Sequence, residues 1–305
     1  MNTNLLSKGS LVYCKSGANL PKKCGIQYIC KLKTIDMPSD LNILITNDDG
    51  YSSNGIRELV AMMRQFGRVT VVAPRTHQSG MSVAVSLGNR PLAYKFLGVI
   101  DGVSWSWLDA SPASCVKFAL DKIFPGRRCD VVVCGVNHGT NASVATNYSG
   151  TMGAAEEAAI NGIPAIGVSL CEFGDDPDFS SVAGRFPAIF SKLMDNWPTG
   201  RRMSYNVNFP PAATPVKGVR VCHQGYGYWV EEFEPWEGSA PSEITDRVDG
   251  LYVMRGRFLD GSPREDRCAD HHALEDGYIS ISPQTIDRTD HDEERRLGSL
   301  LNEEF

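Results

Sequence analysis

The chain has 305 residues, 42% hydrophobic and 22% charged, which is an ordinary composition for a soluble globular protein. Its formal net charge of −6 argues against binding to a nucleic-acid polymer, which requires a basic surface. No apolar run of about 18 residues occurs, so neither a transmembrane helix nor a membrane partner is expected. The nine cysteines are scattered without a C-x-x-C pair, which favours a reducing, cytoplasmic location.

The first part of the chain differs in composition from the rest. Residues 1–37 contain six lysines and a single acidic residue, Asp36. An organelle transit peptide, a flexible extension and a misplaced start all agree with this composition. The absence of arginine and of a clean amphipathic helix weakens the transit-peptide interpretation. We therefore predict that residues 1–39 form a flexible N-terminal extension.

The first structured elements are predicted as strand, helix and strand. Residues 42–46 form a short apolar run that is typical of a buried strand. From residue 54 apolar side chains recur at helical spacing until Gly67, and residues 69–73 form a second apolar run that ends at a proline. This order predicts a parallel α/β sheet, because parallel strands need a crossover helix.

The same alternation continues to residue 170. Ser111 and Pro112 are a typical helix start, and that helix is predicted to reach about residue 124. A buried strand over residues 130–134, an alanine-rich helix over 149–161 and a strand over 165–170 follow. Residues 40–171 are therefore predicted to form an α/β core with a mainly parallel sheet.

After residue 171 the pattern changes. Short β-like runs alternate with turns, which predicts a smaller, β-rich C-terminal lobe over residues 172–305. A helix is also predicted around residues 182–197, with its proline near the start. The charged tail from residue 287 is predicted to be a helix that docks on a partner subunit.

Polar residues follow three of the predicted strands. Asp48 and Asp49 follow the first, Ser79 follows the second, and Asn137 and Asn141 follow the third. Ligands of open α/β sheets bind outside the carboxyl ends of the strands, so these side chains are expected at one edge. Together they supply oxygen ligands for a hard divalent ion, and adjacent carboxylates repel one another unless a cation lies between them.

A simpler interpretation of the two aspartates is an Asx-turn that leads into the next helix. The coincidence of polar side chains at all three strand ends favours the metal site instead. A second candidate is the helix start at residues 148–153, where Ser149, Gly150 and Thr151 offer free N–H groups and hydroxyl donors to a phosphate. Simple helix capping by Ser149 is the alternative there.

Two further groups of residues could bind metal or move protons. Cys268, His271 and His272 suggest a zinc site, but no second pair of ligands accompanies them, so this interpretation is disfavoured. His138 could act as a general acid, although a loop histidine is more often a structural donor.

Four motifs, in this order and at these separations, resemble those of the SurE family of survival-protein nucleotidases. The resemblance covers roughly residues 41–290. The four motifs are residues 45–50 (ITNDDG), 73–80 (APRTHQSG), 135–141 (GVNHGTN) and 148–151 (YSGT). Residues 206–210 (NVNFP) and 277–283 (GYISISP) are weaker matches to later segments of the family.

The resemblance implies a Rossmann-like core with a smaller C-terminal lobe, homodimers or homotetramers, and one divalent ion, Mg²⁺ or Mn²⁺. It implies that the metal ligands are Asp48, Asp49, Ser79 and Asn137. It also implies that the phosphate and substrate pocket consists of Gly80, Asn141, Ser149, Gly150 and Thr151.

The implied activity is hydrolysis of nucleoside 5′- and 3′-monophosphates, with short polyphosphate as a further substrate of some members. Asp48 or Asp49 would then also act as the catalytic base. Two alternatives remain. A non-catalytic sensor of metal and nucleotide would use the same ligands, whereas a nicotinamide or nucleotide-sugar enzyme is disfavoured because the G-x-G-x-x-G fingerprint is missing.

Overall fold

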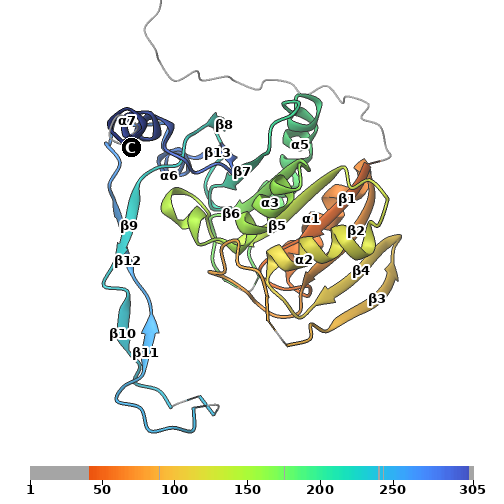
Figure 1. The fold of residues 1–305 in the computed structure, drawn as a ribbon, viewed down its shortest axis with the longest axis horizontal. Coiled ribbons are helices and arrows are strands. Elements are labelled where there is room, and N and C mark those ends of the chain that lie inside the picture. The colour runs from red at the N-terminus through yellow and green to blue at the C-terminus, as the bar shows by residue number, and fades with distance from the viewer. Residues whose placement is uncertain (1–40, 89, 175, 240, 243, 302–305) are drawn as a thin grey trace, which may run out of the picture.

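The computed structural model describes residues 41–88, 90–174, 176–239, 241–242 and 244–301. The flexible extension predicted for residues 1–39 lies outside the described residues. One nine-stranded sheet runs through the described part of the chain, with helices packed on it (Figure 1). The strand order is β3-β4-β2-β1-β5-β6-β7-β13-β8.

Six adjacent strands at the centre of this sheet are parallel. They are β4 (Val103–Leu108), β2 (Gly67–Pro74), β1 (Leu41–Thr46), β5 (Val131–His138), β6 (Ala165–Leu170) and β7 (Met203–Phe209). At the edges, β3 (Tyr94–Ile100) is antiparallel to β4, β13 (Tyr278–Thr285) is antiparallel to β7, and β8 (Gly218–Val221) is parallel to β13. The mainly parallel α/β fold predicted from the sequence is confirmed.

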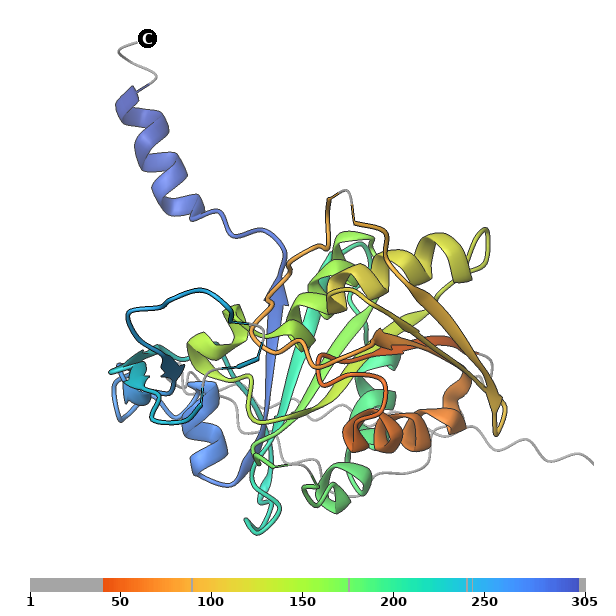
Figure 2. The same ribbon diagram turned by 90° about the horizontal axis from the view of Figure 1, so that it is seen from below.

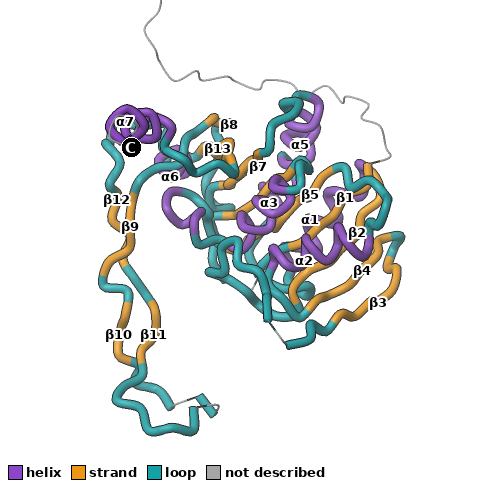
Figure 3. The backbone as a smooth tube through the Cα atoms, viewed as in Figure 1, coloured by secondary structure: helices purple, strands orange, loops and turns teal. Residues whose placement is uncertain are grey.

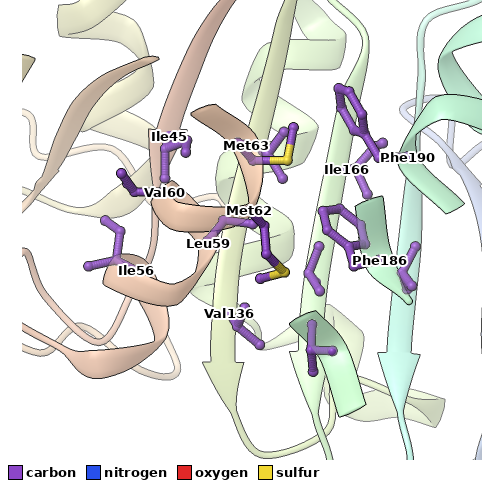
Figure 4. Packing of buried hydrophobic residues seen from close by; sticks show 14 of the residues in the cluster. Ile45, Ile56, Leu59, Val60, Met62, Met63, Val136, Ile166, Phe186 and Phe190 are labelled. Atoms are coloured by element: carbon purple, nitrogen blue, oxygen red, sulfur yellow. The ribbon is translucent and has the colours of Figure 1, made fainter. Parts of the chain in front are cut away.

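Helices cover both faces of the sheet. Helices α1 (Asn54–Met63) and α5 (Phe186–Asp195) pack on one face, and α2 (Pro112–Phe118) and α3 (Gly150–Ile160) pack on the other. Successive residues of β1 alternate between these layers: Ile43 and Ile45 contact the first, and Leu44 contacts the second. Figure 4 shows Ile45 beside α1, with Phe186 and Phe190 of α5 in the same cluster.

Several short helical segments complete this part of the chain. The helix predicted over residues 182–197 is divided into α4 (Ser180–Ala183) and α5, and Pro187 lies in the first turn of α5. Tighter 3₁₀ turns occur at Arg64–Phe66 and Ser143–Asn147, and a wider π turn at Ala119–Ile123 prolongs α2. Among the described helices, none is long and apolar enough to cross a membrane.

The C-terminal part of the chain adds both to the sheet and to an extension beside it. Strands β7, β13 and β8 lie beyond the boundary predicted at residue 171, so the sheet itself continues across that boundary. The division into two units stays a prediction. Strand β9 (Gly227–Val230) pairs with β12 (Arg257–Asp260), and β10 (Phe233–Pro235) pairs with β11 (Tyr252–Met254). We call residues 226–261 the β arm; it projects away from the sheet (Figure 3).

Two helices follow this arm in the chain. Helix α6 (Asp270–Glu275) packs beside β13 and lies near the base of the arm. Helix α7 (His291–Leu301) extends away from the body, and none of its residues is buried (Figure 2). The helix predicted in the charged tail therefore forms, whereas its docking on a partner subunit stays a prediction.

Candidate active site

Asp48 and Asp49 begin the loop that follows β1, and Asn47 shapes this loop. The Asn47 Nδ2 group donates hydrogen bonds to the carbonyl oxygen of Gly50 (2.9 Å) and to Oγ of Ser53 (2.8 Å). Gly50 has a φ of 98°, which is strained for a residue with a side chain. Asn47, rather than either aspartate, therefore makes the turn, and both carboxylates remain available for other contacts.

Asp48 is almost completely buried, with 3% of its surface exposed. The Thr151 hydroxyl donates to Oδ1 (2.6 Å), and the Thr151 backbone N–H donates to Oδ2 (3.1 Å). Burial, followed by repulsion from Asp49, raises the pKa of Asp48 to about 6, although the hydrogen bonds from Thr151 act in the opposite direction. The start of α3 is thus directed at this carboxylate.

Asp49 faces a pocket of about 500 Å³, which His77, Ser79 and His138 also line. Its side chain is 8% exposed, and its Oδ1 lies 3.5 Å from Nδ1 of His77. The backbone N–H of His138 donates to its Oδ2 over 3.4 Å. Burial raises the pKa of Asp49, and the nearby His138 lowers it. Asp49 is therefore the aspartate that is directed into the pocket.

The loop after β2 lies against Asp48. The backbone N–H of Gln78 donates to the Asp48 carbonyl oxygen over 2.7 Å, which places Ser79 in the lining of the Asp49 pocket. Gly80 has a φ of 77°, and a Cβ atom at this position would meet nothing within 4 Å. Its backbone conformation, rather than lack of space, therefore favours glycine there.

Asn137 lies within a strand and not in a loop, which corrects the strand end predicted at Cys134. Strand β5 continues to His138, and its pairing with β6 shifts register between Cys134 and Asn137. The Asn137 side chain is buried, and its Nδ2 donates to the carbonyl oxygen of Gly139 (2.8 Å). No described residue donates to its Oδ1, so this oxygen is available as a ligand.

The start of α3 fits closely against Asp48. Ser149 is the N-cap, and its Oγ accepts a hydrogen bond from the backbone N–H of Met152 (3.0 Å). A Cβ atom at Gly150 would lie 2.8 Å from Cβ of Asp48 and 2.9 Å from its Oδ2. A side chain at this position would therefore have to displace Asp48. The alternative capping role of Ser149 is thus present in the structure, and phosphate binding here stays a prediction.

Asn141 is held by a buried network of amides from β7. Its backbone N–H donates to Oδ1 of Asn208 (2.8 Å), and its carbonyl oxygen accepts from Nδ2 of Asn206 (2.8 Å). Its Nδ2 donates to Oγ of Ser169 (2.8 Å), and Asn208 Nδ2 donates to Asn206 Oδ1 (2.8 Å). Asn206 and Asn208 were not among the residues predicted for the site. Two amides at alternate positions of an otherwise apolar strand were the signal.

His138 is held by one hydrogen bond at Nδ1 and by packing around its ring. Its Nδ1 lies 3.0 Å from the carbonyl oxygen of Gly174, and its ring packs against Phe179 with centroids 5.4 Å apart. Its Nε2 is buried and has no hydrogen-bond partner among the described residues. A Cβ atom at Gly55 would lie 3.2 Å from this nitrogen, so α1 packs directly on the ring. These contacts favour the structural role over proton transfer.

The predicted site residues thus lie along the carboxyl edge of the parallel strands. Asp48 contacts Thr151, Asp49 shares a pocket with Ser79, and Asn137 precedes the residue that donates to Asp49. Two adjacent buried carboxylates with a free amide oxygen suit a hard divalent ion, which would compensate their repulsion.

Comparisons with known proteins identify the family to which the chain is similar. A family model described as "Survival protein SurE" matches residues 43–231. A 5′-nucleotidase SurE from Cytophaga hutchinsonii is 40% identical over 85% of this chain and 95% of its own length. One from Phocaeicola vulgatus is 38% identical over 81% of this chain and 91% of its own length. The crystal structure of the SurE protein from Aquifex aeolicus superposes with a TM-score of 0.67, with 28% identity, over 85% of this chain and 98% of that one.

Proposed function

Because the chain belongs to the SurE family, we propose that it is a metal-dependent 5′-nucleotidase that hydrolyses nucleoside monophosphates. The observation that carries this proposal is the pair of adjacent carboxylates at the carboxyl edge of the sheet. Asp48 is buried under the start of α3, and Asp49 is directed into the neighbouring pocket. An uncompensated acidic pair is costly in such a place, and a bound cation removes the cost.

The metal would be held by four oxygen ligands, and Mg²⁺ or Mn²⁺ is the class that such ligands prefer. When bound, the ion neutralises phosphate charge and makes a coordinated water more acidic. The free Oδ1 of Asn137 supports its assignment, and so does the position of Ser79 in the Asp49 pocket. The proposed ligands are Asp48, Asp49, Ser79 and Asn137.

Side chains of the protein hold the carboxylate ionised, accept the proton of the attacking water and stabilise the phosphate charge. Thr151 donates to both oxygens of Asp48, which favours the ionised carboxylate. Asp49 is the aspartate we assign as the base, since it faces the pocket and can accept the proton of an attacking water. The start of α3 stabilises the added negative charge on the phosphate. The proposed phosphate-binding residues are Gly80, Asn141, Ser149, Gly150 and Thr151.

We also propose a homodimer or homotetramer that forms through the β arm and α7, in a cytoplasmic location. The arm exposes large apolar side chains, including Phe233 (67% exposed) and Tyr252 (66% exposed). Leu297, Leu300 and Leu301 of α7 are also exposed. Apolar surface of this kind favours association. Light scattering should give a mass two or four times that of the 33.4 kDa chain; a monomer at micromolar concentration would contradict the proposal.

Phosphate release tests the activity directly. A panel of 5′- and 3′-nucleoside monophosphates and short polyphosphate would be incubated with Mg²⁺, with Mn²⁺ or with excess EDTA. We expect release that requires metal and is lost in Asp48→Asn but not in Asp121→Asn, which removes an exposed carboxylate (69% exposed side chain). Absence of release from folded protein that still binds metal and nucleotide would favour the non-catalytic sensor instead.

A further inference from the structure

A second cluster of metal-binding residue types lies away from the acidic pair, at the base of the β arm. Asp260, the last residue of β12, contacts two neighbouring histidines of α6. Nε2 of His271 lies 2.9 Å from its Oδ1, and Nε2 of His272 lies 2.7 Å from its Oδ2. One ligand atom from each of the three side chains lies within 4.8 Å of the others. Three possible ligands from two neighbouring elements, β12 and α6, thus lie close together.

Each imidazole also faces a second oxygen on the side away from Asp260, and for His272 this oxygen lies within hydrogen-bond distance. Nδ1 of His272 lies 2.8 Å from the carbonyl oxygen of Asp266. Nδ1 of His271 lies 3.6 Å from Oδ1 of Asp270. When the Nδ1–H group of a histidine donates to a supporting acceptor, the lone pair of Nε2 is free to bind a metal. Metal-binding histidines commonly have this arrangement. From this geometry we propose that Asp260, His271 and His272 bind a zinc ion.

The polar groups behind the cluster are buried and not fully bonded. Asp270 is completely buried, and His271 is about nine-tenths buried. Among the described residues, neither Nδ1 of His271 nor Oδ2 of Asp270 has a hydrogen-bond partner. A buried polar group without a partner is costly. An ion that fixed Nε2 of His271 would orient the ring so that Nδ1–H could close the short remaining gap to Asp270.

The ligand atoms of the cluster favour zinc over Mg²⁺ and Ca²⁺. Two imidazoles with one carboxylate suit zinc, which accepts nitrogen and oxygen ligands, whereas Mg²⁺ and Ca²⁺ prefer oxygen alone. A pocket of about 460 Å³ opens beside the cluster; its lining contains Asp260, His272, Glu275 and Asp276 as well as Arg264 and Arg267. It gives the ion a route from solvent and leaves room for a water at the fourth position.

From the sequence, a zinc site at Cys268, His271 and His272 was disfavoured because no second pair of ligands accompanies these residues in the chain. The structure supplies the missing donor from another element: Asp260 lies 11 residues before His271 and 12 before His272. It reaches them because β12 pairs with β9 and so returns to the base of the arm. The spacing therefore matches no common zinc motif.

The position of the cluster assigns the ion a structural role. Oδ1 of Asp270 accepts the backbone N–H groups of Ser143 and Gly225, each over 2.9 Å, which ties α6 to the body and to the start of the arm. Asp260 belongs to the arm itself. An ion shared by Asp260 and α6 therefore joins the β arm to the body, near the positions of β12 and α6 in Figure 1.

Zinc binding tests this proposal, with the protein first freed of metal and then titrated against a chromophoric zinc chelator. All measurements use the Asp48→Asn protein, because the acidic pair is a competing metal site. We expect one zinc ion per chain in this protein, and an affinity weaker by roughly 100-fold or more after His272→Asn is added. His223→Asn is the matched control, since Nε2 of His223 lies 2.8 Å from a carboxylate oxygen of Asp266, outside the three proposed ligands; it should leave zinc binding unchanged.

Equal zinc affinity in the His272→Asn and His223→Asn proteins, or no zinc bound by the Asp48→Asn protein, would overturn the proposal. Asp260→Asn provides a second variant at a more exposed position (36% exposed side chain), in case His272→Asn fails to fold. Zinc should slow amide hydrogen exchange in β9 and β12, and Asp260→Asn should abolish that effect. Neither measurement uses phosphate release, so failure here is distinguishable from failure of the proposed nucleotidase activity.

Discussion

Replacing Asp48 with asparagine should stabilise the metal-free protein. The pKa of Asp48 rises from 3.8 to about 6, mainly through burial, and this difference corresponds to about 3 kcal/mol of unfavourable free energy when the carboxylate is ionised. Asparagine carries no charge and can keep both contacts. Its Oδ1 would accept the Thr151 backbone N–H, and its Nδ2 would donate to the Thr151 hydroxyl. We therefore expect a gain of up to about 3 kcal/mol at pH 7.

The gain should depend on pH in a defined direction. Below the ordinary pKa of 3.8 the carboxyl of Asp48 is protonated in both the folded and the unfolded chain, so its charge costs nothing. Between 3.8 and about 6 the unfolded chain releases its proton first, and the wild-type protein loses stability as the pH rises. Above about 6 the loss is complete. The advantage of Asp48→Asn should thus be small at pH 4 and maximal at pH 7.

Urea denaturation in EDTA, followed by circular dichroism at both pH values, measures the effect. Adding Mn²⁺ should make wild type the more stable protein, because the ion binds only the folded state. Its charge also compensates the repulsion between Asp48 and Asp49, which is absent from the variant. Asp121→Asn, on an exposed carboxylate, is the control and should change neither result. The reasoning about the buried charge is refuted if Asp48→Asn is less stable than wild type at pH 7 in EDTA. It is also refuted if the stability advantage of the variant is as large at pH 4 as at pH 7.

Three further substitutions test the surroundings of this carboxylate. Gly150→Ala places a Cβ atom 2.8 Å from Cβ of Asp48, so kcat for phosphate release should fall roughly 100-fold while circular dichroism stays unchanged. Thr151→Val removes a hydrogen bond that lowers the pKa of Asp48, so the acidic limb of the pH–rate profile should move to higher pH. Asn208→Ala leaves the buried N–H of Asn141 without its acceptor, which should cost about 1–3 kcal/mol in urea denaturation and raise KM.

The strands and their common edge could be predicted because their signals are local. Residues 42–46 and 165–170 are continuous apolar runs bounded by polar or turn residues, and both form strands of nearly the predicted extent. Strand β5 exceeded its predicted end because its last two residues, Asn137 and His138, pair with β6 after a shift in register. Such a register shift depends on the neighbouring strand, so the apolar pattern of β5 alone does not predict it.

The position of the proposed site residues near one edge of the sheet was predictable, whereas the contacts between them were not. Each predicted residue except Asn137, which lies within β5, follows a strand or begins a helix, and the local pattern fixes such positions. The hydrogen bonds between Thr151 and Asp48 join residues 103 positions apart, so their existence depends on how α3 packs against β1. For the same reason phosphate binding was the only role predicted for Thr151, whereas its hydrogen bonds to the Asp48 carboxylate were not predicted.

The C-terminal part of the chain contributes to the site as well as to the arm. Asn206 and Asn208 of β7 hold the backbone of Asn141, and Asp270 of α6 holds the backbone N–H of Ser143 two residues further along. The loop after β5 is therefore fixed between the core and elements beyond residue 171. Because Asp270 also supports His271 of the proposed zinc cluster, occupancy of that cluster should influence how firmly this loop is held. A catalytic unit truncated at residue 171 would lose all three supports.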